Sequence, residues 1–245
     1  MTISPAVSAY GNDIIPLRSL KLIGIHGHAG AGKDTVASYI QSRHQNCYIE
    51  SFAAPLKRVC AAAFGLNVEE FYNREWKEEE TFWGTTPRKI AQFVGTEMFR
   101  DVINDLITKG SNSHWINLLE ARLTGVSFPP EGEGHYEPGD TVIIPDVRFQ
   151  DEANWIWANG GIIISLLRDG CEGKVGIPGH ASEAGIYGVS NSSDKTYVIQ
   201  NNSTLGDLYE TVNEMIRFYN NQGYLSLKLE PEYEPTTGKY KDSDF

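Results

Sequence analysis

The sequence predicts an α/β fold built on a parallel sheet of five short strands flanked by helices. Two observations support this prediction. Short apolar segments alternate with segments whose apolar residues recur at helical spacing, as expected for parallel strands joined by helices. The first such unit, residues 22–40, joins its strand to its helix through a glycine-rich turn. The predicted strands cover residues 22–25, 47–52, 141–146, 162–167 and 196–199.

The glycine-rich turn has the spacing of a phosphate-binding P-loop. Gly27, Gly32 and Lys33 satisfy the pattern, but Asp34 follows the lysine and the hydroxyl comes one position later, at Thr35. Glycines let backbone N–H groups turn inward around phosphate oxygens, and the start of the next helix adds a positive field. We therefore predict a nucleotide-phosphate site. The alternative is a glycine-rich turn without a ligand.

Bulk composition limits the classes of function. The 245-residue chain is 40% hydrophobic, has a formal net charge of −11 and contains no basic block, so we expect no nucleic-acid polymer as a partner. No apolar run reaches the roughly 18 residues of a membrane span, and the N-terminus lacks a signal-peptide pattern. We therefore expect a cytoplasmic protein without a membrane partner. Cys47, Cys60 and Cys171 have no metal-binding spacing and are predicted to be structural.

The helices expected between the strands differ in pattern. An alanine-rich helix ends before Gly65, and residues 71–88 form a polar and aromatic insertion whose charge run, 77–80, is predicted to be solvated. A long helix begins at Lys89. It carries an apolar stripe beside a polar one. The apolar stripe is Ile90, Phe93, Val94, Met98, Val102 and Leu106, and the polar stripe is Gln92, Thr96, Arg100 and Asn104. Further helices are expected over 114–123, 152–158 and 205–219.

We expect a single domain, residues 1–245, with a core over about 20–222. A helical insertion covers about 53–125. The glycine-rich segment 169–193, which contains His180, Ser182 and Glu183, is either a lid or a long surface loop. The polar tail, 223–245, contains a short predicted strand at 224–229.

Ligands of parallel sheets bind at the carboxyl ends of the strands. This rule gathers residues 27–35, 52–57, 146–148 and Arg168 at one edge. Asp146 ends a strand there and could hold Mg²⁺, or could cap a helix instead. Arg168 could stack on a purine or neutralise a transferring phosphate.

Other polar and aromatic residues near this edge have alternative interpretations. Arg148 could bind a phosphate through two hydrogen bonds, and Glu152 could orient it, bond a sugar or base, or be a surface carboxylate. Arg100 either faces the cleft or is solvated. Of Lys57 and Arg58, which start a helix, one should be at the surface. Phe52 and Trp115 could stack on a base or belong to the core.

These segments together resemble the deoxynucleoside monophosphate kinases of bacteriophages. The matching segments are GHAGAGKDT, SFAAPLK, QFVGTEMFRDVI, HWI, IIPDVRFQDEA, GGIIISLLR and HASE, which span about residues 23–208. The resemblance implies a P-loop fold like that of nucleoside monophosphate (NMP) kinases, with an NMP-binding helical insertion and a lid. It also implies transfer of the γ-phosphate of ATP to a deoxynucleoside 5′-monophosphate (dNMP), with Mg²⁺.

The predicted sites follow from the motifs and this resemblance together. The residues expected at ATP are Ala29, Gly30, Ala31, Gly32, Lys33, Asp34, Thr35 and Arg168. The dNMP residues are Phe52, Lys57, Gln92, Arg100, Trp115, Asp146, Arg148 and Glu152. The metal ligands are Asp34, Thr35 and Asp146, and the catalytic residues are Lys33, Arg100, Arg148 and Arg168.

Three alternatives to this function stay open. A related architecture serves phosphomevalonate kinases, which also have a segment like HASE. A nucleotide-dependent switch would use the P-loop without needing Arg100 or Arg148. An assembly factor could use the acidic tail as a docking arm. The partners expected are small-molecule substrates, a homodimer is left open, and a phage origin would place the protein in the host cytoplasm.

Overall fold

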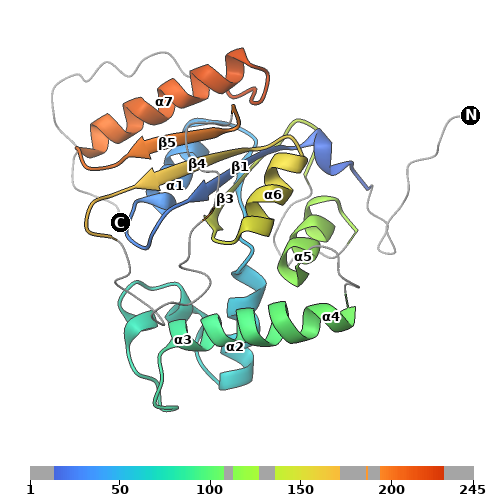
Figure 1. Cartoon of the computed structure of the whole chain (residues 1–245), viewed down its shortest axis with the longest axis vertical. Coiled ribbons are helices and arrows are strands. Elements are labelled where there is room, and N and C mark those ends of the chain that lie inside the picture. The colour runs from blue at the N-terminus through green and yellow to red at the C-terminus, as the bar shows by residue number, and fades with distance from the viewer. Residues whose placement is uncertain (1–13, 108–112, 127–135, 172–185, 187–193, 229–245) are drawn as a thin grey trace, which may run out of the picture.

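A five-stranded parallel sheet forms the centre of the protein, as predicted (Figure 1). The computed structural model describes residues 14–107, 113–126, 136–171, 186 and 194–228. The strands are β1 (Lys21–His26), β2 (Cys47–Ile49), β3 (Thr141–Val147), β4 (Ile162–Leu167) and β5 (Thr196–Gln200). Their order across the sheet is β2-β3-β1-β4-β5, so the first strand lies in the middle.

The central strands are nearly continuous apolar runs because both faces of the sheet are covered by helices. Helices α1 (Lys33–Arg43) and α7 (Leu205–Asn221) pack on one face, and α5 (His114–Leu123) and α6 (Gln150–Ala158) pack on the other (Figure 1). The contact is close at Gly24 of β1. A Cβ atom there would lie 2.6 Å from the Ile156 side chain of α6, which would have to shift.

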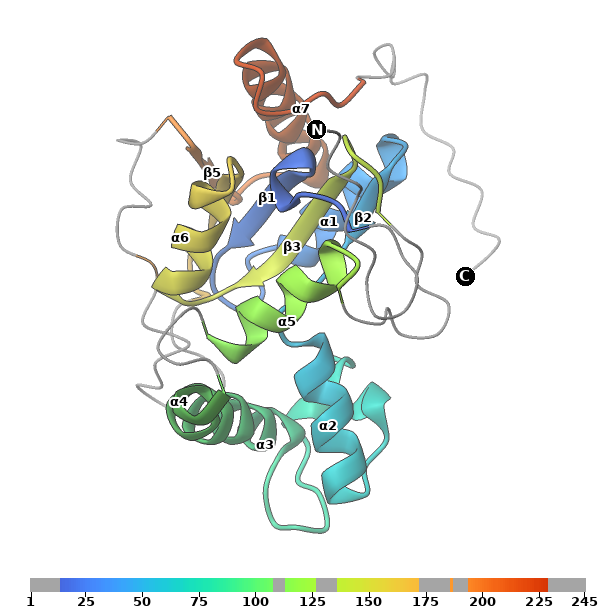
Figure 2. The ribbon, with the colours of Figure 1, turned by 90° about the vertical axis from the view of Figure 1, so that its right-hand side faces the viewer.

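A group of helices lies beyond α5, away from α7 (Figure 2). It contains α2 (Ala54–Phe64), α3 (Pro87–Phe93), a π-helical stretch (Val94–Ile103) and α4 (Asn104–Ile107), with 3₁₀ turns at Val68–Phe71 and Trp76–Glu78. A further 3₁₀ turn, Leu17–Ser19, precedes β1. The Ala-rich helix ends at Gly65, as predicted, where the backbone is left-handed (φ 63°).

The predicted apolar stripe of the long helix is wrong. Ile90 and Val94 are buried, but the other four positions of the stripe are exposed. The exposed residues are Phe93, Met98, Val102 and Leu106. Hydrogen bonds in a π-helix join residues five apart, so positions after Val94 that are spaced for an α-helix do not stay on one face. Phe93 lies before this stretch, in α3.

The short strand predicted at the start of the tail is also wrong within the residues described. Residues 224–228 form no strand. Instead the amide of Asn220 donates to the Leu227 carbonyl (2.6 Å) and accepts from its N–H (3.1 Å), while Leu225 and Leu227 are buried against α7. A side chain of α7 thus takes the place of a neighbouring strand.

Several predictions fall partly or wholly outside the described residues. Most of the predicted lid, with His180, Ser182 and Glu183, lies there, as does the tail from residue 229. The division into core, insertion, lid and tail stays a prediction. Among the described residues, none of the helices combines the length and apolar character that crossing a bilayer requires. Cys47 and Cys60 are buried, and burial raises the pKa of each thiol to about 11, in keeping with a structural role.

Candidate functional site

The P-loop runs from the end of β1 into the first turn of α1, and its glycines are required by its shape. Gly30 and Gly32 have φ angles of 84° and 102°, a region that side chains disfavour. A Cβ atom on Gly27 would lie 2.6 Å from the Leu166 carbonyl oxygen, and one on Gly32 would lie 2.6 Å from the Asn201 side chain. The loop backbone therefore packs tightly against the ends of β4 and β5.

Side chains from three parts of the chain hold this loop. The Lys33 ammonium donates to the carbonyl oxygens of Gly27 (2.7 Å) and His28 (2.9 Å). Arg168, just after β4, donates to the Gly30 carbonyl at 3.4 Å. Asn201, just after β5, donates to the Ala31 carbonyl at 2.8 Å. The predicted ATP residues of the loop and Arg168 therefore lie together. Asn201 was missed, although its place at a strand's carboxyl end was a signal.

A second pocket, of about 170 Å³, lies between β3, α2, α6 and the long helix. All eight residues predicted to bind the dNMP line it. They come from distant segments of the sequence, as the rule for strand ends anticipates. Asp34, at the start of α1, interacts electrostatically with Lys57 and Lys77 of this pocket, so the pocket and the P-loop are neighbours. The roles of these residues stay predictions, but their convergence is observed.

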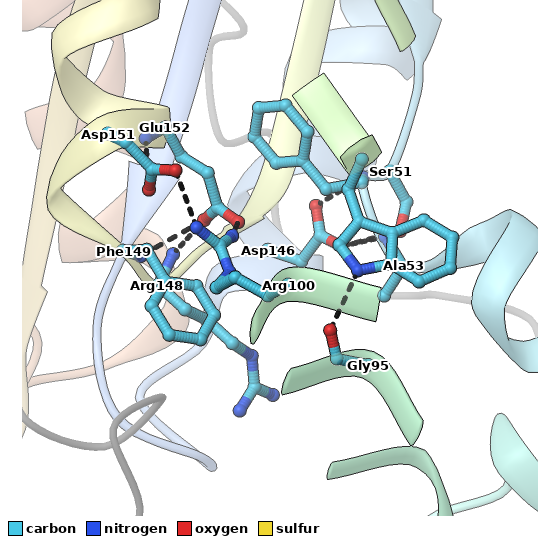
Figure 3. A network of polar contacts seen from close by, with 11 residues as sticks. Ser51, Ala53, Gly95, Arg100, Asp146, Arg148, Phe149, Asp151 and Glu152 are labelled. Atoms are coloured by element: carbon cyan, nitrogen blue, oxygen red, sulfur yellow. Dashed lines mark hydrogen bonds and ion pairs between the residues drawn. The ribbon is translucent and has the colours of Figure 1, made fainter. Parts of the chain in front are cut away.

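The Asp146 carboxylate is held by the turn that leads into α2 (Figure 3). One oxygen accepts hydrogen bonds from the Ser51 hydroxyl (2.6 Å) and the Ala53 N–H (2.9 Å). The other accepts from the Phe52 N–H at 3.1 Å. Asp146 thus stabilises the amino end of α2, as in the helix-capping alternative, while it lines the pocket. The same contacts explain why β2 ends at Ile49, before the predicted residue 52.

Arg100 is bound to two carboxylates at the amino end of α6 (Figure 3). Its terminal nitrogens lie 2.5 Å from an Asp151 oxygen and 2.7 Å from a Glu152 oxygen. Its guanidinium also stacks over the Phe149 ring, 3.7 Å from the centroid. Arg100 therefore faces the pocket rather than solvent. Sequence reasoning missed Asp151, whose side chain is 39% exposed.

Glu152 is buried, so the surface interpretation of this residue is wrong. Its second oxygen accepts from the N–H groups of Arg148 (2.8 Å) and Phe149 (3.0 Å). Burial raises the pKa of the Glu152 carboxyl to about 7, although Arg100 and the two N–H donors favour its charged form. Glu152 therefore connects Arg100 to the first turn of α6. The Arg148 side chain extends away from this carboxylate (Figure 3).

The two aromatic candidates belong both to the pocket and to the core. Trp115 is 5% exposed and donates its indole N–H to the Gly95 carbonyl at 3.0 Å. Phe52 packs edge-on against Trp155, with 6.0 Å between ring centroids. Both side chains also line the pocket, so they could contact a ligand there without leaving the core.

Two basic residues of the pocket were missed by sequence reasoning. Lys77 lies in the charge run predicted to be solvated, yet it is partly buried and lines the pocket, so the prediction is wrong for this residue. Arg88, in the first turn of α3, lines it too. Lys57 does so as predicted, and its neighbour Arg58 is exposed, so one of the two is at the surface as expected.

The donor set for a metal is small. No three His, Cys, Asp or Glu residues cluster in a way that could hold a metal ion within the part of the chain that the structure describes. Asp34 and Thr35 are exposed in the first turn of α1, beside the loop. Mg²⁺ is commonly bound by one or two protein oxygens together with phosphates and water. Asp34 and Thr35 have this chemistry, whereas Asp146 already accepts three hydrogen bonds.

A P-loop at the end of the central strand, with a second pocket beside it, defines a P-loop kinase-like protein. No protein-family model matches the chain. Among curated proteins, it is 34% identical to a protein of Acanthamoeba polyphaga mimivirus named "Putative deoxynucleotide monophosphate kinase", over 78% of this chain and 93% of that protein. It is 25% identical to the "Deoxynucleoside-5'-monophosphate kinase" of Escherichia phage T5, over 46% of this chain and 70% of that protein. The chain belongs to the deoxynucleotide monophosphate kinase family.

Proposed function

We propose that the protein transfers the γ-phosphate of ATP to a deoxynucleoside 5′-monophosphate, giving ADP and the deoxynucleoside diphosphate used as a DNA precursor. The observation that carries this proposal is the position of the second pocket. It adjoins the P-loop, and it gathers all eight residues that motif and resemblance assign to the dNMP. The names of the two viral relatives support the same substrate class.

The donor would bind along the P-loop. Backbone N–H groups of residues 27–33 would receive its phosphates, and Lys33 would exchange its two loop carbonyls for phosphate oxygens. Arg168 lies against Gly30 and is placed to neutralise charge that develops on the phosphates. Asn201 holds the Ala31 peptide so that the loop keeps its shape.

The acceptor needs no general base. The second pKa of a phosphate monoester is about 6, so its oxygen is mostly ionised at neutral pH. That oxygen forms a bond to the γ-phosphorus while the bond to the bridging oxygen of ADP breaks. The task of the protein is in-line positioning and charge neutralisation. Arg148 would serve this task, because it lines the pocket and interacts electrostatically with His26, the last residue of β1 before the P-loop. Arg100 lines the same pocket but is already bound to two carboxylates.

Mg²⁺ is expected with ATP, and Asp34 and Thr35 would hold it. A metal held there would supply positive charge next to the phosphates of ATP. With three hydrogen bonds in place, Asp146 would contribute through a bound water. A homodimer and a cytoplasmic location, or a host cytoplasm for a viral protein, stay predictions.

An acceptor panel tests this function. ADP formation from ATP would be measured with dAMP, dGMP, dCMP and dTMP, with the four ribonucleotides, and with phosphomevalonate. We expect ADP only when a dNMP is present. A preference for phosphomevalonate would show that the acceptor is not a dNMP. Slow ATP hydrolysis that needs no acceptor and is unchanged in Arg148→Ala would favour a nucleotide-dependent switch.

A further inference from the structure

The cations around the second pocket differ in whether an anion already neutralises them. Arg100 is fully neutralised, because Asp151 and Glu152 occupy both of its terminal nitrogens. The cluster of Arg100, Asp151 and Glu152 contains two carboxylates and one guanidinium. A phosphate placed there would meet two carboxylates and would have to displace a buried ion pair. Arg100 is therefore a poor binding group for a second anion.

Two other cations of the pocket, Lys57 and Lys77, lack such partners within the part of the chain that the structure describes, and a third, Arg88, is paired with one carboxylate through one nitrogen. In the described residues, neither Lys57 nor Lys77 has a carboxylate within 4.0 Å or a hydrogen bond from its ammonium. The Lys57 ammonium lies over the Tyr72 ring instead, 3.8 Å from its centroid. Arg88 pairs with Glu78 through Nε at 2.5 Å, and across those same residues neither of its terminal nitrogens makes a hydrogen bond. The described lining of the pocket thus carries five cationic side chains and only two carboxylates, those of Asp146 and Glu152.

Burial makes this arrangement costly when the pocket contains no anion. The Arg88 side chain is only 9% exposed. Burial lowers the pKa of Lys57 and of Lys77, and neighbouring cations lower both further, while Asp146 and Asp34 near Lys57, and Glu78 and Asp34 near Lys77, offset only part of this. Lys77 repels Lys57, Arg88 repels Lys77, and Arg148 repels both lysines. A dianion placed among these groups would supply the missing negative charge and several charge-assisted hydrogen bonds.

We infer that Lys57, Lys77 and Arg88 bind the 5′-phosphate of the acceptor, and that Arg100 instead positions α6 at the other side of the pocket. This inference rests on the proposed function, because it takes the acceptor to be a phosphate monoester. The orientation fits transfer from ATP. Asp34 of α1 interacts electrostatically with both lysines, so a phosphate bound by them would lie on the side of the pocket nearer the start of α1.

The chain offers a matched control for each of these cations. Each has a basic neighbour in the sequence that is exposed and does not line the pocket. The pairs are Lys57 with Arg58, Lys77 with Arg74, and Arg88 with Lys89. The two members of a pair carry the same charge, so a difference between their variants reports position rather than net charge.

Calorimetric titration of each dNMP, and of the deoxynucleoside that lacks its phosphate, separates phosphate binding from base binding. We expect Lys77→Gln and Arg88→Gln each to weaken binding of the dNMPs by about 10- to 100-fold, the usual range for a charged hydrogen-bond partner. Binding of the deoxynucleosides should change by less than about two-fold. Arg74→Gln and Lys89→Gln should change neither. If Arg88→Gln does not fold, dNMP binding by Lys77→Gln and Lys57→Gln tests the inference.

Two results would overturn the inference. One is wild-type affinity for the dNMPs in the Lys77 and Arg88 variants. The other is loss of the phosphate contribution in Arg100→Gln alone. If the wild-type protein binds no dNMP, the proposed function fails, and titration with pyrophosphate then decides the site by itself. Weaker pyrophosphate binding in Lys77→Gln but not in Arg74→Gln would support the phosphate site, and equal binding would reject it.

Discussion

The two halves of the candidate active site are built in different ways. The P-loop is one contiguous segment, and its shape is fixed by glycines that pack against β4 and β5. The second pocket is assembled from side chains that lie more than 90 residues apart in sequence, such as Phe52 and Arg148. Recognition through a backbone loop needs a few glycines at fixed spacing. Recognition through converging side chains needs the whole fold.

The two halves also differ in how their cations are held. Lys33 rests on carbonyl oxygens of its own loop, which can be exchanged for phosphate at little cost. Among the cations of the second pocket, Arg100 is bound to two carboxylates, whereas Lys77 is partly buried and forms no ion pair within the described residues. We therefore expect variants of the P-loop to change the rate, and variants of the pocket to change folding stability or acceptor binding.

The largest effect is expected for Lys33→Ala. It removes the only lysine of the P-loop, so kcat should fall by about 10³-fold or more, in line with the loss of other transition-state cations. Affinity for the dNMP should stay unchanged, because Lys33 does not line the second pocket. Coupled ADP assays and calorimetric dNMP titration give the two numbers. Equal losses in both would show that the two halves are not separate.

Next in size is Glu152→Ala. It leaves Arg100 with one carboxylate and frees the N–H groups of Arg148 and Phe149, so the free energy of unfolding should fall by about 3–5 kcal/mol. Asp151→Ala is the control, since it removes the more exposed partner of the same arginine and should cost about 1 kcal/mol or less. Denaturant unfolding measures both. Similar losses in the two variants would mean that burial of Glu152 contributes little.

The fold and the P-loop could be predicted because their signals are local. Each strand is a short apolar run, and the loop motif spans fewer than ten residues. Asp146 and Arg148 were also within reach, because they follow directly from the rule that ligands lie at strand ends. The prediction of an apolar stripe failed at Met98 and Val102, because nothing in the residue spacing reveals a π-helical stretch.

The missed residues lie where the sequence has no periodic pattern. Lys77 lies in a 3₁₀ turn and Arg88 in the first turn of α3, just after a segment of turns and loops, so neither has enough regular sequence before it to indicate a direction for its side chain. A charge run in such a segment is usually solvated, and three of its four members are exposed here. Asn201 was missed for a different reason. Its contact with Ala31 joins residues 170 positions apart.

A smaller effect is expected for Asn201→Ala, which tests the support of the P-loop. The variant removes a hydrogen bond to the Ala31 carbonyl, so affinity for ATP should fall by about 2- to 10-fold. Acceptor affinity should stay the same. Asn202→Ala is the control, because Asn202 accepts from the Asp169 N–H and does not touch the loop. Titrations of both variants with ATP and with a dNMP would measure the two affinities. A loss of dNMP binding in Asn201→Ala would contradict the view that the P-loop and the second pocket bind their ligands independently.

The smallest expected effect is a dependence of dNMP affinity on pH. Burial lowers the pKa of Lys57 and Lys77 below the ordinary 10.5 when the pocket lacks an anion. A bound phosphate stabilises the protonated form and raises both values again, so binding takes up protons in this window. Affinity should therefore fall by about three-fold as pH rises from about 7 to about 9.5, a range in which the phosphate itself is already ionised.

Proton uptake distinguishes this effect from general loss of the fold at high pH. Calorimetry in buffers of different ionisation enthalpy measures the protons bound with the dNMP. Uptake should decrease in Lys77→Gln and persist in Arg74→Gln, because Lys77 lines the pocket and Arg74 does not. The charges that act on Lys77 are Arg88, Glu78, Asp34, Arg148 and Lys57. Affinity that stays constant or rises with pH would mean that the lysines are not near the bound phosphate. The cations Lys57, Lys77 and Arg88 would then bind some other anion.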